Sequence, residues 1–226
     1  MNYYGQNGED YILHLLLSDV RNGYFVEVGC IDGKRFSNTL CFEELGWKGM
    51  CIEAHSDYIE MLRKNRPNSR VIHAAVSSED ENETTFYANA RGSLSTLDKA
   101  REEDFRVNYA QYFSGFKPQI VRKTRLSTLF KFYGIVKIDL LSIDVEGSEI
   151  EVLEGLNFKE CLPKVIIVES ESMQHTNDVN EILKNEGYYF IGMIEQNLIY
   201  SQSKSDKEKI RNRRFKKVLV THTSHP

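Results

Sequence analysis

Short apolar runs alternate with segments of helical spacing along most of the chain. The runs at 24–29, 49–53, 70–77, 137–147 and 164–170 have the length and the flanking glycine or polar residues that are typical of buried strands. Between them, apolar positions three and four residues apart predict helices over 6–17, 38–46, 57–65, 148–155 and 176–186. Strands that alternate with helices predict a doubly wound α/β fold, in which a mostly parallel sheet lies between two helical layers.

The C-terminal part of the chain changes to a β-rich pattern. Two apolar runs, 188–194 and 197–202, flank Glu195 and Gln196 and predict a hairpin, and 215–222 has the composition of a last strand. We expect one domain over 1–226, because no repeat or low-complexity linker interrupts the chain. The hairpin offers an exposed edge through which the protein could form a homo-oligomer.

The stretch from 84 to 119 breaks the alternation of strands and helices. The sequence TTFYA at 84–88 alternates in polarity, and we expect it to pair antiparallel beside 70–77. From 89 to 119, small residues, a charged run and five aromatic residues replace the regular pattern. Segments of this length in compact domains are usually functional. We expect 89–119 to be a partly helical insertion that covers the active site; the alternative is a surface excursion with its own apolar cluster.

Composition narrows the class of protein. The chain has 226 residues, 41% of them hydrophobic and 27% charged, which is typical of a globular protein with a full core. A formal net charge of -4 gives no general attraction to nucleic acid or anionic membranes. No basic leader and no apolar run of about 20 residues is present, so we expect a cytoplasmic protein without a membrane span. The four cysteines are scattered and indicate buried free thiols.

A glycine turn follows the first predicted strand. The sequence YFVEVGCIDG at 24–33 runs through Glu27, Gly29 and Gly33, and the next strand ends in Glu53. Glycine allows a ligand to approach the backbone, and a carboxylate about twenty residues further on can accept hydrogen bonds from ribose hydroxyls. These features predict a nucleoside-cofactor site. Cys30 stands where a dinucleotide fingerprint has its second glycine, which disfavours a nicotinamide dinucleotide.

The E-x-G-x-x-x-G spacing resembles the first motif of class I S-adenosylmethionine-dependent methyltransferases. Over about residues 5–170 the chain resembles, more narrowly, the FkbM family of methyltransferases, in the following segments: GQNGEDYIL, FVEVGCIDG, FSNTLCFEELGWKGMCIEA, HAAVS, RLSTLF, LLSIDVEGSEIEVLEGL and VIIVE. The resemblance implies a seven-stranded sheet with an antiparallel last strand. It also implies methyl transfer from S-adenosylmethionine to a hydroxyl, often on a sugar or a natural product.

The resemblance further implies which residues bind the cofactor. The resemblance implies that Glu27, Gly29 and Gly33 surround the methionine part of the cofactor. It also implies that Ser37 and Asn38 bind the methionine carboxylate, because a helix N-terminus favours an anion. The other implied contacts are Glu53 at the ribose, Ala75 and Val76 at the adenine, and Gln6 and Asp144 elsewhere on the cofactor.

Carboxylates cluster after the fourth and fifth strands. Asp144 and Glu146 follow one strand, and Glu169 and Glu171 follow the other, at the edge where open α/β sheets bind ligands. An aliphatic hydroxyl needs a base or a metal to become a nucleophile, so Asp144, Glu169 and the nearby His175 are the catalytic candidates. The same carboxylates resemble the Mg²⁺ ligands of some O-methyltransferases. Alternatively, Glu146 and Glu149 cap the next helix, and Glu169 accepts a hydrogen bond from a backbone amide. The sequence leaves the base and the metal open.

Several functions remain open at this level. The leading hypothesis is an O-methyltransferase that acts on a sugar, a glycan precursor or a natural product; other acceptors are a lipid, a peptide or an RNA ribose. A non-catalytic nucleoside-binding module of the same fold is the alternative from another class. The basic segment 204–217 could contact a phosphorylated acceptor or be a solvated helix face, and without interleaved aromatic residues it argues against nucleic acid.

Overall fold

A seven-stranded sheet forms the centre of the protein, in a computed structural model that describes residues 1–211. Its strands are β1 (Tyr24–Val28), β2 (Lys48–Glu53), β3 (Ser69–His73), β7 (Leu140–Ile143), β8 (Val165–Glu169), β9 (Tyr189–Ile194) and β10 (Asn197–Ser201). The spatial order is β3-β2-β1-β7-β8-β10-β9, and the reversal between β1 and β7 creates the crevice in which doubly wound sheets bind ligands.

The direction of the strands follows the prediction. The neighbours from β3 to β8 are parallel, whereas β10 is antiparallel to both β8 and β9. The predicted hairpin is therefore confirmed. The last strand of the described residues, β10, is antiparallel to its neighbours, as expected. The further strand predicted at 215–222 lies outside the described residues.

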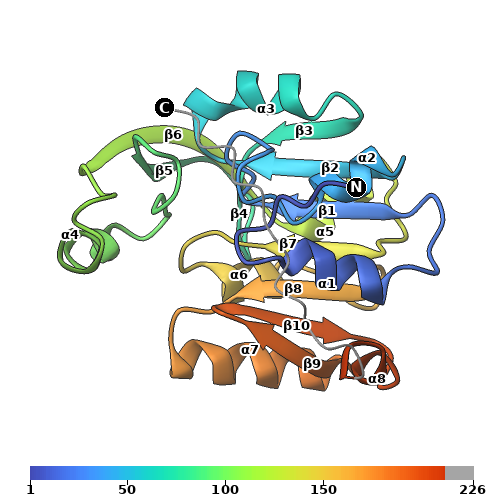
Figure 1. Ribbon diagram of the computed structural model, residues 1–226. Helices are drawn as coiled ribbons and strands as arrows, with labels where there is room; N and C mark the ends of the chain where they lie inside the picture. The colour runs from blue at the N-terminus through green and yellow to red at the C-terminus, as the bar shows by residue number, and fades with distance from the viewer. Residues whose placement is uncertain (212–226) are drawn as a thin grey trace.

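Helices cover both faces of the sheet, as expected for three layers (Figure 1). One face packs against α1 (Glu9–Leu16), α2 (Leu40–Glu44), α3 (Ile59–Asn65) and α8 (Asp206–Arg211). The other face packs against α5 (Leu126–Tyr133), α6 (Glu149–Glu154) and α7 (Met173–Asn185). Side chains alternate along each strand. Phe25 therefore packs on the face covered by α1, α2 and α3, whereas Val26 and Val28 pack on the face covered by α5, α6 and α7. The doubly wound α/β prediction is confirmed.

A second, three-stranded sheet corrects two predictions. The run at 70–77 is not one strand: β3 ends at His73, and β4 (Ala75–Val76) leaves the main sheet to pair in parallel with β6 (Phe116–Thr124). The strand β5 (Glu81–Asn89) pairs antiparallel with β6 rather than beside 70–77. A local alternation of polar and apolar residues predicts a strand but not the strand with which it pairs, because pairing depends on distant parts of the chain.

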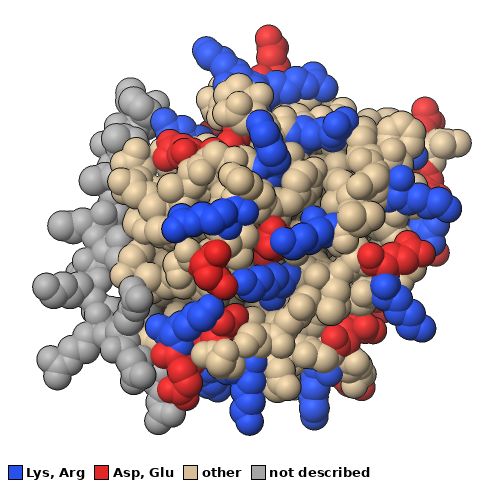
Figure 2. Space-filling view, turned by 90° about the vertical axis from the view of Figure 1, so that its right-hand side faces the viewer, with Lys and Arg blue, Asp and Glu red and all other residues tan. Residues whose placement is uncertain are grey.

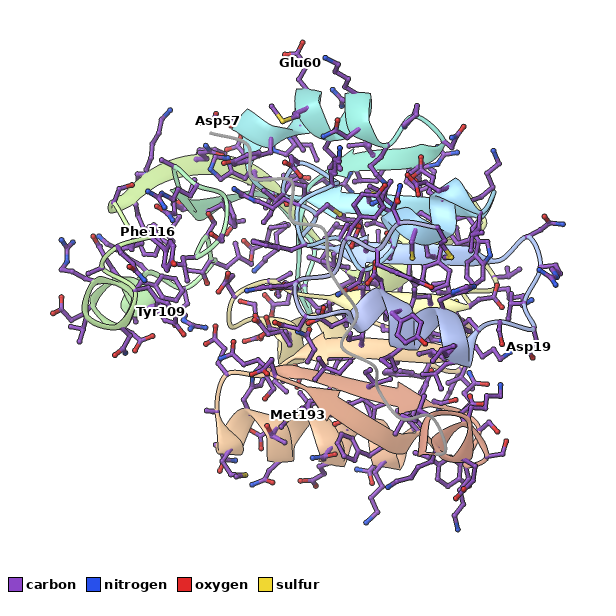
Figure 3. All side chains as sticks on the ribbon, viewed as in Figure 1. Asp19, Asp57, Glu60, Tyr109, Phe116 and Met193 are labelled. Carbon is purple, nitrogen blue, oxygen red and sulfur yellow. The ribbon has the colours of Figure 1, made fainter. Side chains whose placement is uncertain are left out.

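The chain between β5 and β6 forms a lobe on the side toward which the parallel strands point (Figure 1). It holds a 3₁₀ turn (Lys99–Arg101) and α4 (Glu102–Asn108), so the expected partly helical character is present. Figure 3 labels Tyr109 and Phe116 in this lobe, where they pack with buried Leu94, Phe105 and Phe113. The lobe thus has a small aromatic core of its own.

The face on the opposite side from this lobe has mixed charge. Figure 2 shows lysine and arginine side chains interspersed with aspartate and glutamate on that face, without a continuous basic surface. Within residues 1–211, no helix has both the length and the apolar character needed to cross a membrane.

Candidate active site

A cavity of about 380 Å³ opens at the carboxyl ends of the central strands. Most of the predicted site residues line it: Gln6, Glu27, Gly29, Ser37, Glu53, Ala75, Val76, Asp144 and Glu169. Three predicted residues do not line it, namely Gly33, Asn38 and His175. Part of its wall comes from the lobe, namely Gly92, Ser93, Leu94, Ser95, Leu97, Tyr109 and Tyr112. The cavity is therefore bounded by both the sheet edge and the lobe.

The two glycines of the first turn serve protein packing. Gly29 has φ +82°, and a Cβ on it would lie 1.7 Å from the carbonyl oxygen of Asp144. Gly33 has φ +78°, and its Cβ would lie 2.6 Å from Cγ of Arg66. The sequence predicts that these glycines let a ligand approach the backbone. In the structure, the backbone after β7 occupies the space beside Gly29, and the side chains of Leu62 and Arg66 occupy the space beside Gly33.

Glu53 fixes the turn that follows β1. Its Oε2 accepts hydrogen bonds from the amides of Cys30 (2.9 Å) and Ile31 (2.7 Å), and its Oε1 accepts one from the amide of His55 (2.7 Å). Burial raises the pKa of the Glu53 carboxyl, while these amides oppose that shift. Backbone donors thus fix the carboxylate of Glu53 at the wall of the cavity.

Glu27 is held by the chain itself. Its carboxylate accepts hydrogen bonds from the Ser37 hydroxyl, the Asn38 amide (2.9 Å), the Thr39 hydroxyl (2.8 Å) and Arg66 Nη1 (2.9 Å). The Ser37 hydroxyl oxygen accepts the next two amides, those of Thr39 and Leu40. The first amides of α2, which the sequence offered to a cofactor carboxylate, therefore already have acceptors within the protein.

One end of the cavity is apolar. Ala75 and Val76 line it together with Phe86 from β5 and Leu97 from the lobe. Phe86 and Leu97 were not singled out from the sequence, because they reach the site only through the second sheet. Small side chains and a flat aromatic ring line this end, which suits a purine base.

The other end of the cavity is acidic. Burial, followed by neighbouring carboxylates, raises the pKa of Asp144 to about 7, that of Glu146 to about 8 and that of Glu169 to about 12. The side-chain hydrogen bond between Glu169 and Asp144 raises the pKa of Glu169 and lowers that of Asp144, so Glu169 is the carboxyl of the pair that holds the proton. A carboxylate with a pKa near 7 and a fixed neighbour is suited to general-base catalysis.

His175 faces another carboxylate, behind the cavity. Its Nε2 lies 3.5 Å from Oε2 of Glu149. Glu149 is fully buried and accepts hydrogen bonds from the amides of Val145 (3.0 Å) and Gly147 (3.1 Å), so it holds the loop after β7. The geometry connects His175 to that loop rather than to the space where an acceptor would lie.

Two contacts join the lobe to the acidic end. The Leu94 amide donates to Oε1 of Glu146 (2.9 Å), and Arg101 forms an ion pair with Glu171. No local pattern singles out Arg101, because an arginine in a charged run is expected to face solvent.

Strained backbone concentrates at this cavity. Four residues other than glycine that line it have positive φ: Ile31 (48°), Phe36 (62°), Leu94 (59°) and Glu146 (59°). A positive φ is uncommon for any of these residues and is an outlier for a β-branched one such as Ile31. Such strain gathers where function requires a backbone geometry that folding alone would not select.

The acidic end predicts an unusual dependence of stability on pH. Asp144 and Glu146 bind protons more tightly in the folded than in the unfolded chain, so stability present below about pH 4 is lost as pH rises toward 8. We expect Glu146→Gln, which can still accept from Leu94, to raise the Tm at pH 8.5 by about 3–6 °C, equivalent to about 1–2 kcal/mol, and to change it little at pH 5. Differential scanning fluorimetry of the ligand-free protein measures this.

Exposed Glu154 on α6 provides the matched control for that experiment. Glu154→Gln should leave the Tm within about 1 °C of the wild type at both pH values. Equal shifts for Glu146→Gln at pH 5 and 8.5 would contradict the proton linkage.

A protein-family model and several solved structures are similar to this chain. A family model described as Methyltransferase FkbM domain matches residues 27–190. No curated protein matches the chain. Among solved structures, a precorrin-6y C5,15-methyltransferase from Geobacter metallireducens GS-15 is similar at a TM-score of 0.49, with 10% identity over 87% of each chain.

Two further solved structures are similar to a comparable degree. A methyltransferase from Geobacter sulfurreducens has a TM-score of 0.48 and 13% identity, over 88% of this chain and 82% of its own. A putative caffeoyl-CoA O-methyltransferase from Staphylococcus aureus has a TM-score of 0.47 and 13% identity, over 88% and 84%. The family model begins within β1 and extends past β8, and the chain belongs to the methyltransferase FkbM domain family.

Proposed function

We propose that the protein is an S-adenosylmethionine-dependent O-methyltransferase that acts on a hydroxyl of a sugar, a glycan precursor or a natural product. The observation that carries this proposal is the division of one cavity into an apolar end beside Glu53 and an acidic end around Asp144. The first end has the chemistry of a nucleoside site, and the second has that of a proton acceptor.

The proposed position of the cofactor follows this division. Adenine occupies the end lined by Ala75, Val76 and Phe86, and the ribose hydroxyls donate to Glu53. The methionine part lies along the turn after β1, near Ser37 and Gln6, which places the sulfonium methyl toward Asp144. The amides that start α2 are occupied, so the methionine carboxylate uses other donors, of which Arg35 is the cationic side chain in the lining.

The proposed reaction is an in-line displacement. The acceptor oxygen forms a bond to the methyl carbon while the carbon–sulfur bond breaks and its electron pair stays on sulfur, which leaves S-adenosylhomocysteine. The hydroxyl proton passes to the Asp144 carboxylate, for which Glu169 is the hydrogen-bond donor that fixes its orientation. Positioning of the acceptor supplies a further part of the barrier reduction, up to about 7–11 kcal/mol in favourable cases.

We propose that residues 89–119 cover the acceptor within a single domain. Tyr109 and Tyr112 line the cavity, Tyr109 lies close enough to Glu171 and Glu146 to feel their charge, and Tyr112 is 49% exposed. Aromatic rings beside carboxylates suit an acceptor with a ring face and several hydroxyls, because the ring packs on the aromatic side chain while the hydroxyls donate to the acids. This combination supports a sugar or a cyclic natural product as the acceptor.

A Mg²⁺ ion fits the acidic end only in part. Glu146, Glu169 and Glu171 offer oxygens that lie within 4.8 Å of one another. However, Glu171 is already paired with Arg101, and Oε1 of Glu146 accepts the Leu94 amide. A divalent ion would have to displace those partners, so the proposed reaction contains no step that depends on a metal.

Thermal unfolding with ligands tests the cofactor first. We expect S-adenosylmethionine and S-adenosylhomocysteine at a hundred times their Kd to stabilise the fold by about 2.7 kcal/mol, which raises the Tm by about 5–10 °C in a chain of this size. NAD should give no shift. In Glu53→Ala the shift with both sulfur nucleosides should be lost, measured relative to the variant's own ligand-free Tm.

Turnover then separates an enzyme from a binding module. A panel of hydroxylated sugars and phenols is incubated with S-adenosylmethionine, with and without EDTA, and the release of S-adenosylhomocysteine is measured. Binding without turnover on the whole panel would favour the non-catalytic nucleoside-binding module. A Tm shift with NAD alone would refute the methyltransferase proposal.

A further inference from the structure

Arg66 is a buried cation behind the cofactor end of the cavity. It follows α3, its side chain is 0% exposed, and it is the largest fully buried side chain in the described part of the chain. It does not line the cavity. A buried guanidinium is costly unless each donor has an acceptor, so its presence here requires a dense set of partners.

The guanidinium has such a set, drawn from three successive segments. Its donors reach Glu43 Oε2 (2.7 Å, from Nε), Glu27 Oε2 (2.9 Å), Gly33 O (3.2 Å) and Ser37 Oγ (3.1 Å, all from Nη1), and Thr39 Oγ1 (2.7 Å, from Nη2). The group also lies over the ring of Phe25, 5.1 Å from its centroid. One side chain therefore ties β1, the turn after it and α2 together.

These contacts hold the turn at both ends. Glu27 precedes the turn and Ser37 closes it, and both line the cavity. The stem of Arg66 also fills the space beside Gly33, where a Cβ would lie 2.6 Å from its Cγ. The turn between Glu27 and Ser37 is the wall against which the methionine part of the cofactor lies in the proposed function.

The nucleoside end is held by different contacts of the same turn, because two of the amides that bind Glu53 lie between the residues that Arg66 contacts. Glu53 is fixed by the amides of Cys30, Ile31 and His55, and Arg66 donates to none of these groups within residues 1–211. We propose that Arg66 is the positioning residue for the methionine end of the cofactor, acting through Glu27 and Ser37. This inference rests on the proposed function.

Lysine is the informative substitution at this position. It keeps the positive charge between Glu27 and Glu43, but a single ammonium group cannot reproduce the fork of the guanidinium. Arg66→Lys should therefore stay folded while the turn loses its fixed geometry. Arg63→Lys is the matched control, because Arg63 is exposed on α3, the helix that Arg66 follows.

The test compares two ligands by isothermal titration calorimetry. S-Adenosylhomocysteine has the whole cofactor skeleton, whereas 5′-methylthioadenosine keeps the nucleoside and the thioether and lacks the amino acid. In Arg66→Lys we expect the affinity for S-adenosylhomocysteine to fall about ten-fold or more, as when hydrogen bonds to charged groups are misaligned. The affinity for 5′-methylthioadenosine should stay within about two-fold of the wild type, and Arg63→Lys should change neither.

A Glu43→Gln variant separates positioning from general stability. Glu43 contacts Arg66 but does not line the cavity, so this variant should lower the Tm and keep the ratio of the two affinities. The inference would be overturned if Arg66→Lys lowered the affinity for both ligands equally. It would also be overturned if Glu43→Gln changed the ratio of the two affinities as much as Arg66→Lys does. If the wild type binds neither ligand, both the proposed function and this inference fail. If the wild type binds both ligands and the ratio of affinities does not change in Arg66→Lys, only this inference fails.

Discussion

Gly29→Ala should leave a protein that folds poorly and does not bind S-adenosylhomocysteine. The new Cβ would lie 1.7 Å from the Asp144 carbonyl oxygen, and the φ of +82° is unfavourable for alanine. Left-handed backbone costs about 1–2 kcal/mol and overpacking about 1–3 kcal/mol, so we expect a loss of about 2–5 kcal/mol in the free energy of unfolding. The backbone of Asp144 must also move, which displaces the acidic end of the cavity. Urea unfolding and calorimetry measure the two effects.

Gly46→Ala is the matched control for that variant. Gly46 also has a positive φ, of +89°, but nothing lies within 4 Å of its absent Cβ. It should lose only the backbone contribution of about 1–2 kcal/mol and should bind S-adenosylhomocysteine as the wild type does. If the two variants were equally stable and bound equally, the close approach of β1 and β7 would not be the reason for glycine at position 29.

The parts of the fold that obey local rules could be predicted from the sequence. The strand β8 is a continuous apolar run, and every residue from Val165 to Val168 is buried, as expected for a strand covered on both faces. The turn after β1 has a glycine at Gly29, and Glu53 ends β2. The residues at the ends of these strands meet because the carboxyl ends of parallel strands share one edge.

The second sheet and the buried ionic network could not be predicted in this way. The strand β4 is only two residues long, and its pairing with β6 depends on a partner more than forty residues away. Arg66 follows the short helix α3 and precedes Pro67, a position at which arginine usually faces solvent. Its burial depends on Glu27 and Glu43, which are distant in sequence, so no local pattern indicates it.

Asp144→Asn should lower the rate of methyl transfer by about 10²–10⁴-fold at saturating cofactor, the usual contribution of a general base. The wild-type kcat should rise with pH, with a midpoint near 7, because the Asp144 carboxyl must lose its proton before it can accept one from the acceptor. The asparagine amide cannot accept that proton, so the residual rate of the variant should not show this midpoint. The measurement is kcat against pH from 5.5 to 9, with an acceptor that gives turnover.

The other end of the same strand supplies the control. Asp139 precedes β7, is 3% exposed and accepts a hydrogen bond from the Tyr24 amide (3.0 Å), away from the cavity. Asp139→Asn should lower the Tm, because a buried acceptor is altered, and leave kcat and its pH midpoint within about two-fold of the wild type. A loss of less than ten-fold in Asp144→Asn, with an unchanged pH midpoint, would exclude Asp144 as the base. Glu169 would then be the weaker candidate that remains, since a carboxyl with a pKa of about 12 already holds its proton at the pH of the reaction.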